Sequence, residues 1–236
     1  MVLVAGPASA GEVQVAVASN FSEPAREIAA AFRARTGHTA NLTFGASGQI
    51  YAQIAHGAPF EVFLSADAER PAAAERAGLT VVGSRFTYAV GRLVLYSATP
   101  GLVDTQGRVL AQGRFAKIAI ADPAAAPYGA AAVEVLQKLG LYEKLRPRIV
   151  TGASIGQAYQ FTSTGAAELG FVALSQVAAV TGGSRWVAPS GLHRPIIQQA
   201  VLLIPGGNNP SARAFAAFLK SPASKAIIRR YGYEVP

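Results

Sequence analysis

The 236-residue sequence contains no cysteine, which excludes a disulfide scaffold, a cysteine nucleophile and a thiolate metal site. Its three histidines, His38, His56 and His193, lack the spacing of a metal-binding motif, so we expect no direct site for a metal cation. Charged residues make up only 14% of the chain and hydrophobic residues 51%. This composition supplies a packed core and argues against a disordered chain.

Acidic residues are also scarce, at 13 against 21 basic ones, and the formal net charge is +8. The basic residues form no arm or stripe with interleaved aromatic residues, so we predict no nucleic-acid partner. The positive field of the whole molecule should still attract small anions.

Beyond the N-terminus, no hydrophobic run is long and uncharged enough to span a membrane. The first ten residues, MVLVAGPASA, match the end of a secretory signal peptide, with an A-x-A cleavage site before Gly11. We therefore predict that residues 1–10 are a signal-peptide remnant or tail and that the mature protein is soluble and periplasmic.

Short β-type runs alternate with helical patterns along the chain, which predicts an α/β fold with mostly parallel strands. Residues 13–18 (VQVAVA) form the first expected strand, and Ser22 is the expected N-cap of the helix that follows. Gly37 is expected to end that helix. Other expected strands include residues 40–44, 62–65, 92–96, 117–121, 169–173 and 196–204.

Four predicted strand-to-helix corners carry small or neutral polar residues and no charged residue at their tips. Ligands of open α/β sheets bind at the carboxyl ends of the strands. A helix N-terminus offers unpaired N–H donors and about half a positive charge, so such corners bind anions without a cationic side chain. Helix capping alone would explain any single corner. The corners are Ser19-Asn20, Ser47-Gly48, Pro127-Tyr128-Gly129 and Ser154-Ile155-Gly156.

The neutrality of the corners indicates the kind of ligand that they fit. A buried dianion needs many hydrogen-bond donors, and each bond to a charged acceptor contributes about 1.5–3 kcal/mol. About five to seven such bonds, less ordering costs, reach binding free energies of about −8 to −12 kcal/mol. A site without an acidic acceptor disfavours protonated phosphate, because phosphate must itself donate a hydrogen bond.

Seven segments between about Val13 and the C-terminus form a specific pattern through their order and spacing. They are VAVASNF (15–21), FGASGQIYAQIAHGAPFEVFLSAD (44–67), GRLVLYS (91–97), IAIADPAAAPYGAAAVEVL (118–136), ASIGQA (153–158), GAAELGFVALSQV (165–177) and FLKSPASKAIIRRYGY (218–233). In this arrangement the chain resembles the periplasmic molybdate-binding proteins of molybdate ABC importers.

The resemblance implies a type II periplasmic binding protein fold, in which two α/β lobes with mixed, mostly parallel sheets are joined by two hinge strands. The first lobe would comprise residues 11–89 plus 197–236, and the second residues 90–196. The resemblance also implies a protein that is not an enzyme and needs no cofactor. It would bind molybdate or tungstate between the lobes by hinge bending and deliver it to a membrane ABC permease, and we expect it to be monomeric.

By motif match, the resemblance implies that Ser19, Asn20, Ser47, Tyr128 and Ile155 bind the oxyanion. Ser19 and Ser47 would each donate a hydroxyl and a backbone N–H, and Asn20 follows Ser19 in the same corner. Tyr128 and Ile155 would donate backbone N–H groups from the second lobe. Molybdenum or tungsten would thus be held as an oxyanion by these residues.

The chain departs from many members of this family at two positions. Ala46 replaces the first of two hydroxyl residues beside Ser47, and Ala173 replaces a tyrosine whose hydroxyl reaches the anion. The chain looks like the subgroup in which an asparagine in the first corner accompanies the second loss, so we expect Asn20 to compensate.

Other interpretations remain open. The segment 152–156 matches the G-x-S-x-G elbow of serine hydrolases, with Ser154 as nucleophile, His193 as base and Glu168 as orienting acid. Against it, no HGGG-type segment is present, and the motif explains only one corner. The same fold could instead bind sulfate, phosphate, an organic anion or ferric iron, for which the corners offer only Tyr128 with Asp122 nearby. An effector domain of a transcription regulator would need a helix-turn-helix segment, which the sequence lacks.

Overall fold

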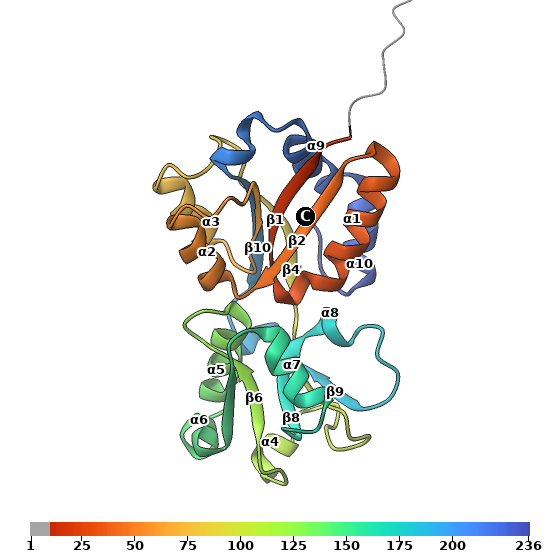
Figure 1. Cartoon of the computed structure of the whole chain (residues 1–236). Coiled ribbons are helices and arrows are strands. Elements are labelled where there is room, and N and C mark those ends of the chain that lie inside the picture. Colours follow the sequence, from red (N-terminus) through yellow and green to blue (C-terminus); the bar gives the residue numbers. More distant parts are fainter. Residues whose placement is uncertain (1–9) are drawn as a thin grey trace, which may run out of the picture.

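The computed structural model describes residues 10–236, so almost all of the predicted signal-peptide remnant lies outside the described residues. Two five-stranded sheets, each flanked by helices, form two bodies that meet at a narrow waist (Figure 1). We call the body around the sheet β2-β1-β3-β10-β4 lobe 1, and the body around the sheet β7-β6-β8-β5-β9 lobe 2.

In lobe 1, β1 pairs in parallel with β2 and β3, whereas β10 runs antiparallel to both β3 and β4. The strands are β1 (Glu12–Ala18), β2 (Thr39–Gly45), β3 (Val62–Leu64), β4 (Phe86–Gly91) and β10 (Ile196–Leu202). The helices around this sheet are α1 (Ser22–Thr36), α2 (Ser47–Ala55), α3 (Glu69–Arg76), α9 (Pro210–Leu219) and α10 (Pro222–Arg230).

Lobe 2 repeats this plan. Its strand β6 pairs in parallel with β7 and β8, and β5 runs antiparallel to β8 and β9. The strands are β5 (Leu93–Ser97), β6 (Ile118–Ala121), β7 (Ile149–Gly152), β8 (Leu169–Ala173) and β9 (Ser184–Val187). The helices are α4 (Val109–Gln112), α5 (Pro127–Lys138), α6 (Tyr142–Leu145), α7 (Ile155–Ser163) and α8 (Leu174–Val177).

The chain crosses between the two sheets beside β4 and β10. Only Arg92 separates β4 from β5, and a 3-10 turn, η3 (Ser190–Leu192), precedes the return into β10. The predicted lobe boundaries fall within β4 and at the first residues of β10, and they remain a prediction. Because β4 and β10 pair with each other in lobe 1, the two crossings lie side by side.

The turn after β1 differs from the expectation. A 3-10 turn, η1 (Ser19–Phe21), precedes α1, which begins at Ser22 itself. The prediction that Ser22 caps this helix is wrong, because the Ser22 hydroxyl donates to the Ser19 carbonyl at 2.8 Å. Gly37 ends α1 as predicted: its φ of 76° is in the left-handed region that favours glycine, and its N–H donates to the Arg33 carbonyl.

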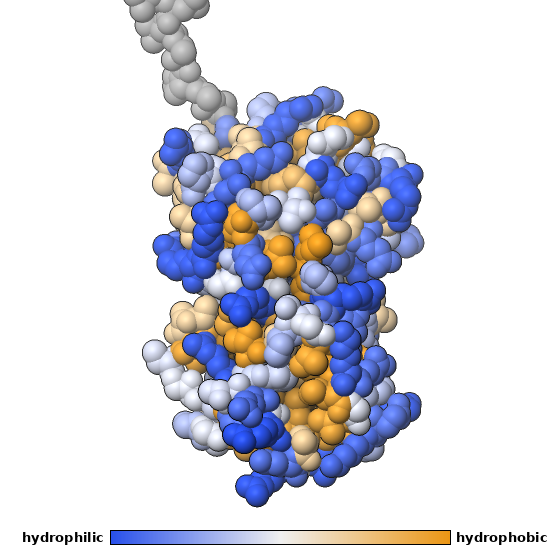
Figure 2. Space-filling model, turned by 180° about the vertical axis from the view of Figure 1, so that it is seen from behind, coloured by the Kyte–Doolittle hydropathy of each residue, from blue (hydrophilic) through white to orange (hydrophobic). Residues whose placement is uncertain are grey.

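Each lobe has its own hydrophobic core. In lobe 1, Phe32 and Phe215 make an edge-on aromatic contact beneath β1, and in lobe 2 Leu95, Ile118 and Phe171 are fully buried. Full burial of such a side chain contributes about 1.5–3 kcal/mol. Seen from behind, the surface is mostly hydrophilic around smaller hydrophobic patches (Figure 2). Within residues 10–236, no helix has the length and hydrophobicity needed to cross a bilayer.

Candidate functional site

A small cavity with about 190 Å³ of empty volume lies where the lobes meet. Lobe 1 contributes the ends of β1 and β2 and the start of α2, and lobe 2 contributes the first residues of α5 and α7. All five predicted oxyanion-binding residues line this cavity, whereas Gly48, Gly129, Ser154 and Gly156 of the predicted corners do not. The lining residues are Ala18, Ser19, Asn20, Gly45, Ala46, Ser47, Ala66, Ala126, Pro127, Tyr128 and Ile155.

The five predicted residues all open a helix or a 3-10 turn. Ser19 and Asn20 begin η1, and Ser47, Tyr128 and Ile155 are the first or second residues of α2, α5 and α7. Such positions have no acceptor within their own helix. Within residues 10–236, none of these five N–H groups donates a hydrogen bond to another protein group. Unpaired amide donors of both lobes therefore surround one cavity.

The two serine hydroxyls are bonded differently. The Ser47 Oγ accepts a hydrogen bond from the Ala66 N–H at 2.9 Å, so the Ser47 hydroxyl proton is left to donate elsewhere. The Ser19 Oγ donates to the Gly45 carbonyl at 3.0 Å. A Ser19 hydroxyl bond to an anion would thus require the bond to Gly45 to break, whereas Ser47 needs no such change.

The Tyr128 side chain points into a buried polar network instead of serving the cavity. Its hydroxyl accepts a hydrogen bond from the Gln198 Nε2 at 3.1 Å. Burial raises the pKa of the Tyr128 phenol well above its usual value, so the side chain stays neutral near pH 7. The backbone N–H is the group of this residue that remains for a ligand, as the resemblance implies.

Asn20 lies at the centre of this network and is almost completely buried. Its Nδ2 donates to the Gln198 Oε1 and to the Tyr233 hydroxyl, both at 2.9 Å. Its backbone carbonyl accepts from the Ser175 hydroxyl of lobe 2 at 2.7 Å. The Asn20 Oδ1 is the only buried side-chain nitrogen or oxygen atom in residues 10–236 without a hydrogen-bond partner. A buried polar atom without a partner is costly, and it calls for a physical explanation.

Sequence reasoning missed the residues that hold Asn20. Gln198 and Tyr233 are 178 and 213 positions away along the chain. Gln198 lies outside the seven segments of the resemblance, and Tyr233 ends the last of them without any local pattern that points to Asn20. The hydroxyl of Tyr88, a third buried residue of the network, donates to the Gln198 Oε1 at 2.9 Å. A glutamine in a strand, here followed directly by Gln199, carries no local signal of this role, so only the folded chain reveals it.

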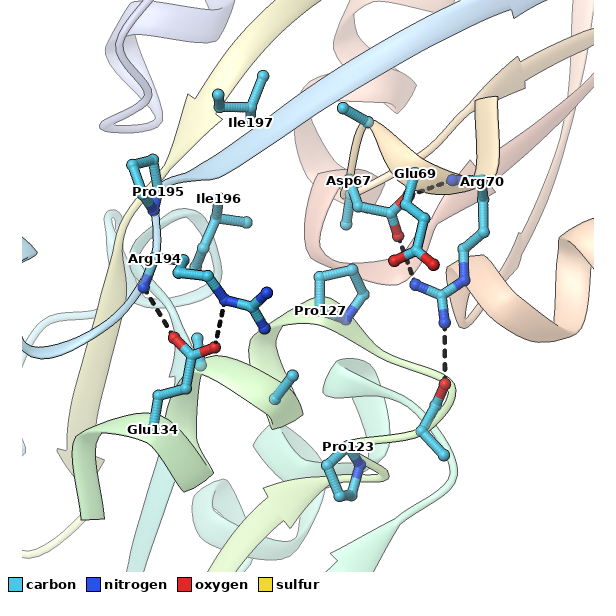
Figure 3. A pocket seen from close by; sticks show the side chains of 15 residues that line it. Asp67, Glu69, Arg70, Pro123, Pro127, Glu134, Arg194, Pro195, Ile196 and Ile197 are labelled. Carbon is cyan, nitrogen blue, oxygen red and sulfur yellow. Dashed lines mark hydrogen bonds and ion pairs between the residues drawn. The ribbon is translucent and has the colours of Figure 1, made fainter. Parts of the chain in front are cut away.

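Among residues 10–236, no charged residue lines the cavity, but a larger groove beside it is rich in charge (Figure 3). The groove shares Ala66 and Pro127 with the cavity and has about 1080 Å³ of empty volume open to solvent. Its two arginines are paired: Arg70 with Asp67 at 2.7 Å, and Arg194 with Glu134 at 2.6 Å. Both arginines of the neighbouring groove therefore already have partners.

The second of these pairs shifts the pKa of the Glu134 carboxyl. Partial burial alone would raise the pKa of Glu134, but hydrogen bonds from the Arg194 backbone and guanidinium outweigh burial and lower it. Arg194 thus bonds Glu134 of α5 through both its backbone N–H and its guanidinium, although its side chain is largely exposed.

The three residues of the hydrolase interpretation each bond to a different protein group and not to one another. Ser154 caps α7 by accepting from the Gln157 N–H at 3.3 Å. Glu168 accepts from the Lys117 N–H at 2.9 Å, and the His193 Nδ1 lies 2.8 Å from the Arg194 carbonyl. Across residues 10–236, no hydrogen bond joins the three, and no group of three histidine or acidic residues is placed to hold a metal ion.

Comparison with known proteins gives concordant results. Residues 13–234 match the family model described as bacterial extracellular solute-binding protein. The chain is 59% identical over 227 residues to the molybdate-binding protein ModA of Rhodobacter capsulatus, covering 96% of this chain and 90% of the relative. It is 55% identical over 234 residues to ModA of Azotobacter vinelandii, covering 98% of this chain and 93% of the relative.

A solved structure agrees with these relatives. The structure of the periplasmic molybdate-binding protein of Azotobacter vinelandii superimposes with a TM-score of 0.92 at 46% sequence identity. The superposition covers 95% of this chain and 99% of the other. The predicted fold class is confirmed: two lobes, each a mixed sheet flanked by helices, as in type II periplasmic binding proteins. Each sheet has two parallel and two antiparallel pairings, so four of its five strands run in one direction, although only half of its pairings are parallel.

Proposed function

The chain belongs to the bacterial extracellular solute-binding proteins and, among them, to the molybdate-binding proteins, and from this premise we propose that it captures molybdate or tungstate between its lobes. The bound oxyanion would then be delivered to a membrane ABC permease. The protein would act by binding and hinge closure, with no covalent chemistry.

The observation that supports this proposal is the set of five unpaired N–H groups, from Ser19, Asn20, Ser47, Tyr128 and Ile155, around one uncharged cavity. Hydrogen bonds to a charged acceptor contribute about 1.5–3 kcal/mol each. Five amides plus the free hydroxyl proton of Ser47 could therefore hold a dianion with micromolar to nanomolar affinity after ordering costs of several kcal/mol. Helix N-termini add favourable partial charge at the same place.

The proposal also explains the unpaired Asn20 Oδ1. The nitrogen and oxygen of an asparagine amide are assigned from their hydrogen-bond partners. If the Asn20 and Gln198 amides turn over together, the Asn20 oxygen accepts from the Gln198 NH₂, and the Asn20 NH₂ becomes a free donor. Tyr233 also donates to the Asn20 oxygen if its hydroxyl proton turns away from the Asn20 carbonyl, which keeps the Ser175 hydroxyl as a donor. We propose that anion binding selects this orientation, because an oxygen lone pair beside a dianion is repulsive. Asn20 would then replace the donor that Ala173 lacks.

The orientation of the Asn20 amide also bears on selectivity. With its oxygen toward the ligand, the site would accept the proton of hydrogen phosphate. With its nitrogen toward the ligand, every group in the cavity donates, and only a fully deprotonated oxyanion is matched. We therefore propose that molybdate and tungstate bind more tightly than phosphate, and that size selects them over the smaller sulfate.

Isothermal titration calorimetry with molybdate, tungstate, sulfate and phosphate tests the function. The expected result is tight one-to-one binding of molybdate and tungstate and weak or absent binding of the other two. Sulfate or phosphate binding as tightly as molybdate would refute the selectivity, and absence of molybdate binding would refute the function.

The N-terminal sequence and the family membership bear on the location and assembly of the protein. We propose that residues 1–10 belong to a secretory signal, that cleavage occurs before Gly11, and that the mature chain is a periplasmic monomer that binds no nucleic acid. Intact-mass measurement of the protein from the periplasmic fraction would detect a chain beginning at Gly11. A mature chain that retains residues 1–10 would contradict the predicted cleavage.

A further inference from the structure

One charged side chain connects the two lobes beside the oxyanion cavity. Arg70, the second residue of α3 in lobe 1, donates from its Nη2 to the Ala124 carbonyl at 2.8 Å. Ala124 lies in the loop between β6 and α5, which belongs to lobe 2. Figure 3 shows this bond across the opening of the charged groove.

The arginine is held in position before it reaches the other lobe. The Asp67 carboxylate accepts from the Arg70 backbone N–H at 2.8 Å through one oxygen and from the Arg70 Nη1 at 2.7 Å through the other. The two side chains are only 20% and 14% exposed. Because Asp67 fixes both ends of the side chain, Arg70 loses little further conformational entropy when it bonds to Ala124.

The loop that Arg70 bonds is itself rigid and leads directly to the cavity. The Asp122 Oδ1 accepts from the Ala124 N–H at 2.9 Å, and the Asp122 carbonyl accepts from the Ala126 N–H at 2.8 Å. The helix α5 begins at Pro127, and the Tyr128 N–H is one of the five donors that line the cavity. The position of the Ala124 carbonyl is thus coupled to the position of the Tyr128 amide.

A second contact next to Arg70 shows how closely the lobes approach. The Gly48 N–H of lobe 1 donates to the Ala125 carbonyl of lobe 2 at 2.9 Å. A Cβ atom on Gly48 would lie 3.1 Å from the Ala125 Cα and oxygen and 3.2 Å from the Arg70 Nε. A side chain at this position would push against Ala125 and Arg70, so the close contact between the lobes here requires a glycine at position 48.

We propose that Arg70, pre-oriented by Asp67, is a closure latch that sets the lifetime of the oxyanion complex without touching the oxyanion. The inference rests on the proposed function and adds to it a positioning residue outside the cavity lining. The latch bond forms only when lobe 2 lies against lobe 1, so it stabilises the closed form. Its loss should speed the opening that releases the ligand and leave the entry of the ligand into the open form unchanged.

The alternative role for Arg70 is electrostatic attraction of the incoming anion. Attraction acts on the association rate and weakens with ionic strength, whereas a latch acts on the dissociation rate. The two rates therefore separate the two roles.

The test compares Arg70→Ala and Arg70→Lys with the matched control Arg85→Ala. Arg85 pairs with Glu75 at 2.9 Å and bonds Gln199, so its contacts stay within lobe 1. Each protein is loaded with radioactive molybdate and chased with excess unlabelled molybdate, which gives the dissociation rate. Calorimetry gives the dissociation constant, and the association rate follows from their ratio.

We expect Arg70→Ala to raise the dissociation rate roughly threefold to thirtyfold, as the loss of one partly exposed charged hydrogen bond implies. Its association rate and both rates of Arg85→Ala should stay unchanged. Arg70→Lys should fall between wild type and Arg70→Ala, because one ammonium group keeps the charge but cannot reproduce the forked geometry that bonds Asp67 and Ala124 together. Gly48→Ala should also raise the dissociation rate.

An unchanged dissociation rate in Arg70→Ala would overturn the latch, and so would a lower association rate with unchanged dissociation. Thermal unfolding of each variant without ligand checks that it is folded, and Arg70→Gln replaces Arg70→Ala if the latter does not fold. Failure of the wild-type protein to bind molybdate would instead refute the proposed function, so the two failures are distinguishable.

Discussion

Replacing Ser47 with alanine separates the structural and the ligand-binding roles of one hydroxyl. The Ser47 Oγ accepts from the Ala66 N–H at 2.9 Å, and Ser47 and Ala66 are only 1% and 2% exposed. Without the hydroxyl, the buried Ala66 N–H has lost its acceptor, which costs about 1–3 kcal/mol in the free energy of unfolding. The hydroxyl proton, which no group in the described part of the chain accepts, is lost to the ligand as well.

The loss of this proton should weaken molybdate binding by about 1.5–3 kcal/mol, because a charged acceptor loses one hydrogen bond. This corresponds to a roughly 10- to 150-fold higher Kd. Calorimetric titration measures the affinity, and denaturant unfolding without molybdate measures the stability. The loss of stability does not affect the measured affinity. The Ala66 N–H is unpaired in both the free and the bound variant, so its cost is the same on both sides of the binding equilibrium.

Ser154→Ala is the matched control for this variant. Ser154 caps α7 and does not line the cavity, so its loss should cost about 0.5–2 kcal/mol of stability and leave the molybdate affinity unchanged. If Ser47→Ala loses stability but retains wild-type molybdate affinity, then its hydroxyl is purely structural and the reasoning about its free proton is refuted.

Three further predictions follow from the same contacts. Asn20→Asp should bind molybdate more weakly than Asn20→Ala in calorimetric titrations. Both variants lose a donor, but the carboxylate of Asn20→Asp also repels the dianion. Equal affinities would place the Asn20 side chain away from the anion. Burial raises the pKa of Tyr233 to about 12, whereas the pKa of an unfolded tyrosine is about 10. The folded state therefore holds this proton more tightly. The free energy of unfolding should therefore fall by about 3 kcal/mol from this group as pH rises from about 10 to about 12, and Tyr233→Phe should show a shallower decline in pH-dependent denaturation; an identical decline would contradict this. Finally, wild type and Ser154→Ala should both fail to hydrolyse p-nitrophenyl acetate above the uncatalysed rate, and Ser154-dependent turnover would revive the hydrolase interpretation.

Much of the candidate site was accessible from the sequence, because each element of it is local. A strand followed by a small or neutral polar corner and a helix is readable over a few residues, as at Ser47 and Ile155, and helix N-termini always carry unpaired amides. The family resemblance then indicated which corners belong together. The structure brings all five predicted residues to one cavity.

What the sequence could not reveal depends on contacts between distant residues or on exact turn geometry. Gln198, Tyr88 and Tyr233 hold Asn20 in a buried network whose members are far apart along the chain. Arg70 can donate a hydrogen bond to the Ala124 carbonyl only because the two lobes lie against each other. At Ser22 the error was local: an N-cap serine and a serine that follows a 3-10 turn look alike in sequence, and only the backbone course distinguishes them.

The central claim is that uncharged donors of both lobes hold a dianion without a cation in contact. A crystal structure of the molybdate-loaded protein, with the anion located by anomalous scattering at the molybdenum absorption edge, tests it most directly. We predict one molybdenum peak in the cavity, with its oxygens accepting hydrogen bonds from the amides of Ser19, Asn20, Ser47, Tyr128 and Ile155. A molybdenum peak elsewhere, or an arginine, lysine or metal cation bonded to the anion, would contradict the account.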